Sequence, residues 1–472
     1  MTSTGLHEIR RDVAPVCPHL FLHLNARRPR GFWAAGDRWV AHAGVLDVVA
    51  VESGAADAAE ARFETVREDS VRVFDALGAG GTSEDAHVRL FGGFAFAPRR
   101  NADPVWRSFP PALFHFPEVE LQHHPEAGVC SLVVRARHPK AAEDSWRRWA
   151  EALKGGVVPG VGRGRRASPA HRGETAAVGT RRSPSPAVTH LSGTERPAWG
   201  RMVWQALNTI GRGDAEKVVL ARALEVAPAR PVNPADLAVA LWEENHGSYV
   251  FLFEPVPGEA IVGAAPEKIA TLVDGVFKAT AAAGSAAVGA DSVATAQLAR
   301  RLFNSPKDRA EHDCVVRDMT ARLRALGCTV QRDVEPHVLA LARIQHLETK
   351  IAAQVPNGTS LLDILAALHP TPAVCGMPRS VALAVLGDSE PFDRGWYAGP
   401  VGWFDSEGGG IFVPALRSAV SSTGRWRLFA GAGIVAGSDP ALEWEETELK
   451  FRPVLRAIAR AGAATRAAAG SG

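Results

Sequence analysis

The stretch KVVLARALEV, residues 217–226, has the pattern of a long apolar strand that begins with a lysine directly after the turn GRGD. With the period of two that a strand imposes, Lys217 shares a face with Val219 and Ala221. A lysine on an apolar face is costly to bury unless it shares or loses its proton. Burial favours the neutral amine, which can act as a general base, so Lys217 is a candidate for that role. The alternative is a lysine that protects an exposed sheet edge.

The sequence on either side of this strand alternates irregularly between strand-like and helix-like patterns. Apolar runs punctuated by Gly and Pro predict earlier strands in RWVAHAG, LDVVAVES, VRLFGGFAFAP and CSLVVRARH. Apolar residues from Trp199 to Ile210 recur at helical spacing, with Thr194 as the expected N-cap. The pattern predicts an α/β (α+β) fold of large, mainly antiparallel β-sheets packed together, with helices on the outside.

A shift in composition divides the chain. Residues 155–190 are rich in Gly, Pro, Arg and Ser, and they have too few large apolar side chains to offset the entropy cost of ordering. We expect a flexible linker or loop there, after an N-terminal β-rich part of the fold in residues 1–154. Residues 191–458 hold the candidate site residues, and the Ala/Gly-rich residues 459–472 are expected to form a disordered tail.

Composition and charge argue against several classes of protein. Lysine and arginine exceed aspartate and glutamate by only 53 − 51 = 2, so no strong field attracts nucleic acid or an acidic membrane. Five scattered cysteines without a CxxC pair argue against a disulfide framework and a structural zinc site. No apolar run approaches the ~20 residues of a membrane-spanning helix. We therefore expect a cytoplasmic enzyme with no nucleic-acid or membrane partner.

Two glutamates that follow the strand are candidates for a buried site. Glu267 lies in the turn APEKIA, where a cleft of low polarity would keep its carboxyl group protonated as a general acid. Glu311 is expected to begin a helix, one turn before Val315 and on or near its apolar face. The alternatives are a solvated turn residue for Glu267 and an exposed ion pair of Glu311 with Lys307. Between the two glutamates, the small side chains of residues 279–285, ATAAAGS, let backbone N–H groups approach an oxyanion closely.

A third acidic segment lies near the C-terminal end. Glu443, Glu446 and Lys450 are spaced i, i+3 and i+7, so they share one stripe of a helix. That helix follows SDP, residues 438–440, whose Ser or Asp can cap it and whose Pro fits its first turn. A Glu–Lys pair at this spacing is ordinary on a helix surface. Together with Glu311, however, the two glutamates could supply the carboxylate oxygens that Mg²⁺ prefers.

A series of motifs runs in order through residues 194–455, with a weaker echo in LFGGFAF, residues 90–96. The motifs are KVVLAR, the APE turn, AGS, SPKDRAEH, IQHLET, LHPTPAVCG, RGWYAGPVGW, PALRS and AGAGIVAGSDPALEWEETELK. The order of these motifs and the residues in them resemble those of the chorismate-utilising enzymes, most of all the isochorismate synthases. The resemblance implies the fold of these enzymes, chorismate as the substrate, Mg²⁺ as the cofactor and a monomeric protein.

The same resemblance assigns roles to single residues. In isochorismate synthases, the residue that matches Lys217 activates water for attack on C2 of chorismate, and the match of Glu267 protonates the leaving C4 hydroxyl. Positions that match Glu311 and Glu446 bind Mg²⁺, and Glu443 is expected near the ion. The other matches are substrate-binding positions around the two carboxylates and the leaving hydroxyl: Gly284, His346, Tyr397, Arg417, Gly431, Gly433 and Lys450.

Two positions address the choice within the family. Anthranilate synthases carry Gln at the position of Lys217, so the lysine favours water as the nucleophile. Ala373 is a pocket position where lysine-nucleophile aminodeoxychorismate synthases place their lysine. We therefore expect an isomerase, an isochorismate synthase that serves menaquinone, siderophore or salicylate biosynthesis. A salicylate synthase and an ammonia-using aminating enzyme stay open as alternatives.

Departures from the family pattern keep a third alternative open. Ala265 stands where relatives often have Ser, and the arginine that often follows AGS is missing after residues 283–285. The altered AGS loop is the one feature that favours a non-catalytic chorismate-binding protein. The predicted catalytic positions are all present, which favours an enzyme.

Overall fold

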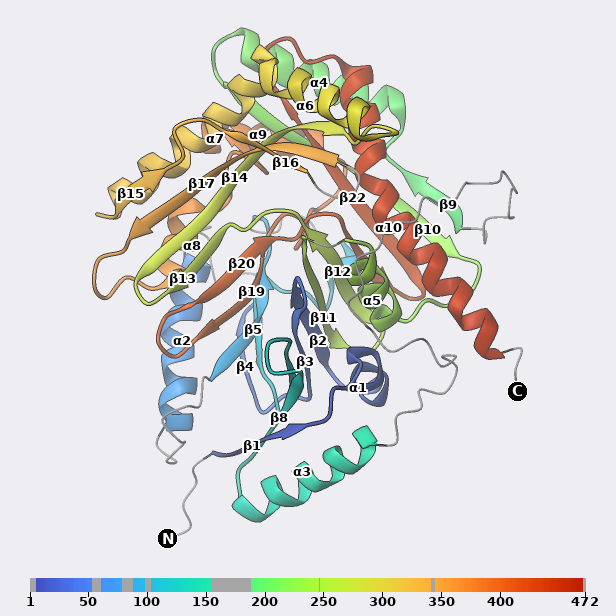
Figure 1. Ribbon diagram of the computed structural model, residues 1–472. Helices are drawn as coiled ribbons and strands as arrows, with labels where there is room; N and C mark the ends of the chain where they lie inside the picture. Colours follow the sequence, from blue (N-terminus) through green and yellow to red (C-terminus); the bar gives the residue numbers. More distant parts are fainter. Residues whose placement is uncertain are drawn as a thin grey trace.

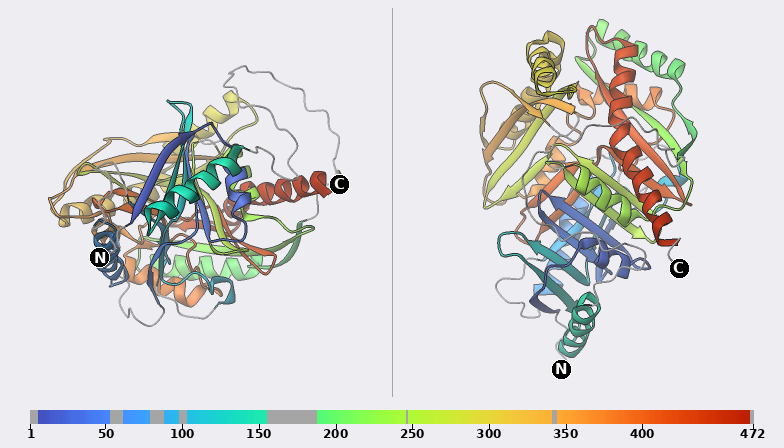
Figure 2. Two further views of the ribbon diagram at one scale, coloured as in Figure 1. Left: turned by 90° about the horizontal axis from the view of Figure 1, so that it is seen from below. Right: turned by 45° about the vertical axis from the view of Figure 1, so that its right-hand side comes forward.

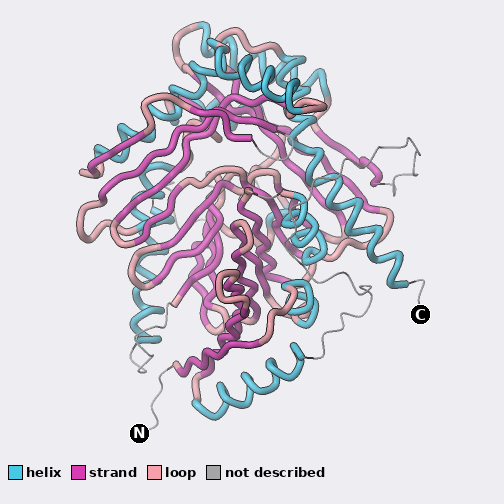
Figure 3. The backbone as a smooth tube through the Cα atoms, in the orientation of Figure 1, coloured by secondary structure: helices cyan, strands magenta, loops and turns pink. Residues whose placement is uncertain are grey.

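Two large antiparallel sheets, packed together and surrounded by helices, form the protein (Figures 1 and 3). The computed structural model describes residues 6–52, 61–78, 88–97, 103–154, 188–245, 247–340 and 344–469. The predicted class of large antiparallel sheets with outer helices is confirmed. Of the predicted linker, residues 155–187 lie outside the described residues, and the last three begin strand β9 (Val188–Gly193).

The first sheet has 12 strands and draws on both halves of the chain. Its strands in spatial order are β1 (His7–Val13), β8 (Val129–Ala136), β7 (Val119–His124), β3 (Arg38–Ala43), β2 (Arg30–Ala35), β11 (Tyr249–Val256), β12 (Glu259–Ala265), β21 (Ser418–Ser422), β22 (Arg425–Ile434), β10 (Lys217–Pro228) and β18 (Gly376–Met377), with β9 paired to β10. Because β2 pairs with β11, the N-terminal strands and the strands of the site region form one continuous sheet.

The second sheet has 10 strands and is also assembled from distant segments. Its strands in spatial order are β15 (Thr329–Arg332), β17 (Ile344–Gln354), β14 (Val276–Ala287), β13 (Ala270–Val273), β20 (Gly410–Pro414), β19 (Pro400–Asp405), β5 (Arg89–Phe94), β6 (Ala112–Phe116) and β4 (Asp47–Val51), with β16 (His337–Ala340) paired to β17. The weak sequence echo in residues 90–96 therefore lies in β5, which pairs with β19 of the RGWYAGPVGW motif.

The helices cover the sheets in layers (Figure 2). They are α1 (Pro18–Leu24), α2 (Ala61–Gly78), α3 (Pro139–Lys154), α4 (Arg196–Gly211), α5 (Pro234–Glu244), α6 (Ser292–Asn304), α7 (Pro306–Ala325), α8 (Leu361–Leu368), α9 (Arg379–Ser389) and α10 (Pro440–Ala469), with a 3₁₀ turn η1 (Pro104–Trp106). Helices α1, α3, α5 and α10 share one apolar core with the 12-stranded sheet, whereas α2, α7 and α8 share another with the 10-stranded sheet. In the described residues, no helix is long and apolar enough to cross a membrane.

Strand β11 shows why the 12-stranded sheet is buried on both faces. Val250 and Leu252 pack into the core beneath α5 and α10, whereas Phe251 and Phe253 enter a third core shared with the 10-stranded sheet, α4 and α9. This alternation follows from the period of two in a strand. Burial of each large apolar side chain contributes roughly 2–3 kcal/mol, so the two-sided burial stabilises the sheet strongly.

The strand predicted from KVVLARALEV is confirmed as β10. It pairs along its length with β22, and its first residues are covered on the other side by β18. Lys217 is fully buried there, so the alternative of a lysine at an exposed sheet edge is wrong.

The predicted start of the helix before this strand is wrong in detail. Helix α4 begins at Arg196 with Glu195 in the N-cap position, and no side chain caps it. Thr194 instead accepts a hydrogen bond from the backbone N–H of Ala223 in β10 at 3.2 Å. A hydroxyl can accept from a strand as well as from a helix, and the sequence does not distinguish the two.

Two other expected boundaries also differ. Helix α7 begins at Pro306 with Ser305 as its cap, so Glu311 lies in the second turn and not at the start. Of the expected disordered tail, residues 459–469 continue helix α10, and residues 470–472 lie outside the described residues. Alanine is the strongest helix former, which explains why this Ala-rich segment extends a helix that is already nucleated. The predicted cap of α10 is confirmed, because the Asp439 carboxylate accepts hydrogen bonds from its first backbone N–H groups.

Candidate active site

One cavity of about 80 Å³ brings together the predicted site residues. It is bordered by β10, β14, β17 and β22, by helices α7 and α10, and by the segments around 266, 373, 397 and 417. All predicted residues except Lys217 and Glu443 line it: Glu267, Gly284, Glu311, His346, Ala373, Tyr397, Arg417, Gly431, Gly433, Glu446 and Lys450. Two larger hollows, of about 750 and 520 Å³, contain none of these residues, so chemistry rather than volume identifies the site.

Lys217 lies directly behind the wall of the cavity. Its Nζ is 3.0 Å from Oε1 of Glu311. Burial alone would raise the pKa of Glu311, but Lys217 and further lysines hold it below the usual value. Gly433 leaves room for the pair, because a Cβ there would lie 2.2 Å from Oε1 of Glu311. The glycine on β22 is thus required by the packing of Lys217 against Glu311.

Glu267 has the properties of an acid that titrates near neutral pH. Its side chain is buried just beyond the end of β12, and burial raises the pKa of its carboxyl group to about 7. Three cations, Lys217, Lys450 and Arg417, oppose this shift without overcoming it. A carboxyl group in this state can donate a proton and then recover it at physiological pH.

His346 links the AGS segment to Arg417. The Arg417 guanidinium lies 2.8 Å from Nε2 of His346, and because a guanidinium only donates, Nε2 is the acceptor. Nδ1 therefore carries the proton and donates it to the carbonyl of Gly284 at 3.2 Å, with the Ser285 hydroxyl 3.0 Å away. Burial and the nearby Arg417 hold the pKa of His346 well below its usual value, so the imidazole is neutral. A neutral histidine with one fixed tautomer orients the guanidinium.

Two backbone irregularities shape this part of the cavity. Gly284 is an extra residue in β14 opposite β17, with φ of +73°, so it forms a bulge that turns its carbonyl toward His346. Arg417 has φ of +45°, which is uncommon for a residue with a Cβ and costs on the order of 1–3 kcal/mol. Strain of this kind is found where a side chain is held for function.

The other side of the cavity is aromatic and basic. Tyr397 is buried and stacks on Phe429, with ring centroids 4.9 Å apart, and burial raises the pKa of its hydroxyl. A Cβ on Gly431 would lie 3.1 Å from the Tyr397 hydroxyl, so this glycine keeps the phenol accessible. Lys450 donates to the carbonyl of Gly431 at 2.8 Å, which directs its ammonium group toward the cavity. These groups can receive an anionic substrate.

The predicted metal ligands are each paired with a lysine in this structure. Glu443 pairs with Lys307, Glu446 pairs with Lys450 at 2.6 Å, and Glu311 pairs with Lys217. Burial and the adjacent Glu446 raise the pKa of Glu443, which indicates that negative charge is crowded here. The ligand oxygens of the three glutamates do not all lie within 4.8 Å of one another. Hard oxygen donors whose charge is balanced by ammonium groups fit a divalent cation that would displace those groups.

Two residues of the site, Arg394 and Lys307, were not identified from the sequence. Arg394 lines the cavity, is buried, and donates to the carbonyls of Val219 and Val374 at 2.6 and 2.8 Å. Lys307 was considered only in the alternative of an exposed ion pair with Glu311, and that alternative is wrong because Lys307 pairs with Glu443 from α10. Arg394 lies in the motif RGWYAGPVGW and Lys307 lies in SPKDRAEH. Their positions in these motifs are the sequence signal that could have identified them as site residues.

Comparisons with known proteins agree with this arrangement. The family model described as "Chorismate binding enzyme" matches residues 2–459. The salicylate biosynthesis isochorismate synthase of Pseudomonas aeruginosa is 35% identical over 378 residues, which is 79% of this chain and 75% of the relative. Isochorismate synthase MenF of Bacillus subtilis is 31% identical over 370 residues, or 78% of this chain and 74% of the relative.

A solved structure gives the same answer for the fold. MenF, the menaquinone-specific isochorismate synthase from Escherichia coli, superposes with a TM-score of 0.74 at 25% identity, covering 97% of this chain and 95% of that chain. The predicted fold, the predicted resemblance to isochorismate synthases and the prediction of an isomerase are confirmed. With the family model matching nearly the whole length, this chain belongs to the chorismate-binding enzymes.

Proposed function

We propose that the chain converts chorismate to isochorismate in a Mg²⁺-dependent reaction, with Lys217 as the base and Glu267 as the acid. The observation that carries this proposal is that the buried Glu267, whose pKa is raised to about 7, lines the same cavity as Glu311, the ion-pair partner of Lys217. A base and an acid whose environments differ in this way support two proton transfers in one step.

The proton transfers balance as an isomerisation. Lys217 in its neutral form takes a proton from water, and the water oxygen forms a bond to C2 of the ring. The C1=C2 and C5=C6 double bonds shift to C1=C6 and C4=C5, and the C4–O bond breaks. Glu267 donates its proton to the departing hydroxyl, which leaves as water, so one water is consumed and one is released.

The cations around the cavity would hold the two carboxylates of the substrate. Arg417 presents a planar fork that matches a carboxylate, and His346 keeps that fork in place. Ala373 leaves a small wall with no amine that could compete with water. These features favour water over ammonia or a lysine as the nucleophile.

Glu311, Glu446 and Glu443 would hold Mg²⁺. The ion would neutralise the ring carboxylate and so make C2 easier to attack. In this structure the ammonium group of Lys217 balances the charge of Glu311. Without Mg²⁺, the ammonium groups of Lys217, Lys307 and Lys450 supply the positive charge that the bound ion would supply to the three glutamates.

Product analysis tests the proposal. With chorismate and Mg²⁺ but no ammonia, the purified protein should form isochorismate reversibly, and EDTA should abolish turnover until Mg²⁺ is added back. Full activity in a metal-free preparation would contradict the metal assignment. Stoichiometric salicylate and pyruvate, or an aminated ring formed only with ammonium, would instead support the alternatives. The names of the relatives make salicylate or menaquinone biosynthesis the expected use of the product.

A further inference from the structure

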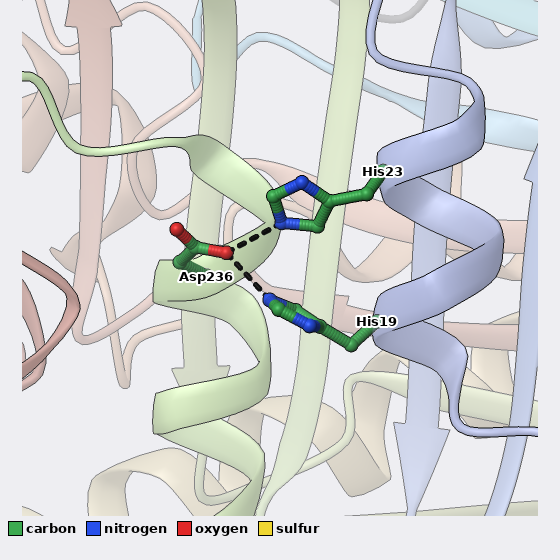
Figure 4. Close-up of side chains that lie close together, drawn as sticks. All are labelled: His19, His23 and Asp236. Carbon is green, nitrogen blue, oxygen red and sulfur yellow. Dashed lines mark hydrogen bonds and ion pairs between the residues drawn. The ribbon is translucent and has the colours of Figure 1, made fainter. Parts of the chain in front are cut away.

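A second cluster of metal-binding side chains lies on the outer face of the 12-stranded sheet and includes no residue that lines the cavity. His19 and His23 project from α1, and Asp236 projects from the first turn of α5 (Figure 4). Nε2 of each histidine is 2.6 Å from the same atom, Oδ1 of Asp236. The two imidazoles meet edge to face, with centroids 4.3 Å apart.

The fold explains why these three side chains converge. Leu20, Phe21 and Leu22 anchor α1 in the apolar core that it shares with α5. Histidines four residues apart lie on one side of a helix, and here that side faces the start of α5. The N-cap of α5 is supplied by Asn233, which accepts from the N–H of Ala235. The Asp236 carboxylate is therefore not needed as a cap and is directed to the histidines.

The donor set matches a borderline-soft divalent ion better than it matches Mg²⁺. Two imidazole nitrogens and one carboxylate oxygen, all within 4.8 Å of one another, are ligands that Zn²⁺ uses. In the described residues this is the one group of three such side chains that is so close together. The side chains of His19, His23 and Asp236 are 12%, 26% and 16% exposed, so an ion can enter and keep a water ligand.

We propose that His19, His23 and Asp236 form a site for a transition metal of the zinc class that joins α1 to α5. Zn²⁺ bonds of about 2.0–2.2 Å in tetrahedral geometry separate two ligand atoms by about 3.4 Å, so each nitrogen must move by less than about 1 Å. For Nε2 of each neutral imidazole to bind the ion, the proton that it now donates to Asp236 moves through solvent to Nδ1 of the same ring.

The position of the site predicts a structural effect. Helix α1 comes from the N-terminal part of the chain, whereas α5 packs on α10, which carries Glu446 and Lys450. An ion bound to both α1 and α5 stabilises the folded state by mass action, because the unfolded chain does not hold the three ligands together. The inference stands on these three residues and does not depend on the proposed reaction.

The test is a metal titration of the full-length protein after chelator treatment, with millimolar Mg²⁺ present to occupy the glutamate cluster. Zn²⁺ should bind at one equivalent per chain and raise Tm, and Co²⁺ should give the visible absorption of a tetrahedral site. His19→Gln and His23→Gln keep a hydrogen-bond donor for Asp236 but lose a good zinc ligand. Each should weaken Zn²⁺ binding at least about tenfold, since the loss of even a supporting residue costs about 10–100-fold.

Two matched controls separate this site from adventitious binding. Cys17→Ser removes the exposed thiol just before α1, and His190→Ala removes an exposed histidine on β9. Both should bind Zn²⁺ like the wild type. The proposal is overturned if the wild type shows no saturable one-equivalent binding, or if His19→Gln and His23→Gln bind as well as the controls. The cluster would then be a hydrogen-bonded contact between two helices.

Discussion

Two buried carboxyl groups, one on the 12-stranded sheet and one just beyond the end of one of its strands, have pKa values shifted in opposite directions. Glu120 on β7 is fully buried, which alone would raise its pKa, yet the neighbouring Arg135 lowers it overall. Arg135 donates to it at 2.5 Å and Gln122 donates at 2.8 Å, while Glu8 on β1 also accepts from Arg135. This network across three adjacent strands fixes an ionised carboxylate in place.

Glu267 is also buried and also has cations nearby, but its pKa is raised to about 7. Among the described residues, no side chain donates a hydrogen bond to it, and Lys217 is engaged with Glu311. The comparison shows that nearby charge and a single backbone donor, here the N–H of Ala282, do not hold Glu267 ionised, whereas Glu120 accepts side-chain hydrogen bonds from Arg135 and Gln122. Glu120 is therefore a structural anion, whereas Glu267 is free to exchange a proton.

The largest expected effect is the loss of the base. Lys217→Ala should lower kcat by on the order of 10²-fold or more, a typical contribution of general acid–base catalysis. Chorismate binding should persist, because Arg417 and Lys450 remain, and steady-state kinetics with a binding titration measures both. Lys350→Ala, on the exposed side of β17, should leave kcat unchanged. Near-normal turnover in Lys217→Ala would mean that another group activates the water.

The two carboxyl groups should respond oppositely to the same substitution. Glu120→Gln should destabilise the protein by about 3 kcal/mol at neutral pH, because it leaves Arg135 buried with one carboxylate fewer. Urea unfolding measures this loss. A change below about 0.5 kcal/mol would show that Glu8 alone satisfies Arg135.

Glu267→Gln should instead stabilise the protein as the pH rises. The folded pKa of about 7 lies above the usual 4.5, so the wild type loses stability between those pH values, where the carboxyl group ionises in the unfolded chain but stays protonated in the folded one. By pH 8 the free energy of unfolding of the variant should exceed that of the wild type by on the order of 3 kcal/mol, with no gain below pH 4.5.

The turnover of Glu267→Gln should fall by on the order of 10²-fold. In the wild type, kcat/KM should decline above about pH 7, and a flat profile there would contradict the assignment of Glu267 as the acid.

A smaller effect is expected at Gly433. The Cβ of Gly433→Ala would meet Oε1 of Glu311 at 2.2 Å and Cε of Lys217 at 3.0 Å, so the ion pair must shift. Activity should fall about tenfold, below the ~100-fold that a 1 Å misplacement can cost. Gly200→Ala in α4 meets nothing within 4 Å and should instead add about 1 kcal/mol of stability at full activity. Equal activity in both variants would show that the room around Glu311 is not needed.

The sequence predicted the residues of the cavity better than it predicted their partners. Motif order identified Glu267, His346 and Arg417, and β10 was evident from its apolar alternation around Lys217. Local patterns cannot show that Lys307 would pair with Glu443, since the two residues are 136 positions apart. Pairing of this kind is decided by how α7 and α10 pack on the sheets.

Some helix boundaries and the cluster of His19, His23 and Asp236 also could not be predicted from local sequence patterns. The Ala-rich end of α10 was expected to be disordered, because composition alone does not reveal that a packed helix precedes it. His19 and Asp236 are 217 positions apart, and neither lies in a motif that would connect them. Their meeting follows only from the packing of α1 against α5 in a shared core.

The most direct test of the account follows the oxygen atoms. Chorismate should be incubated with the enzyme and Mg²⁺ in H₂¹⁸O for a single turnover. The product should then be separated by chromatography and its mass measured by mass spectrometry. Attack of solvent water activated by Lys217, with Glu267 protonating the departing C4 hydroxyl, predicts isochorismate that carries one ¹⁸O at C2. Isochorismate without the label, or salicylate with pyruvate as the main products, would contradict it.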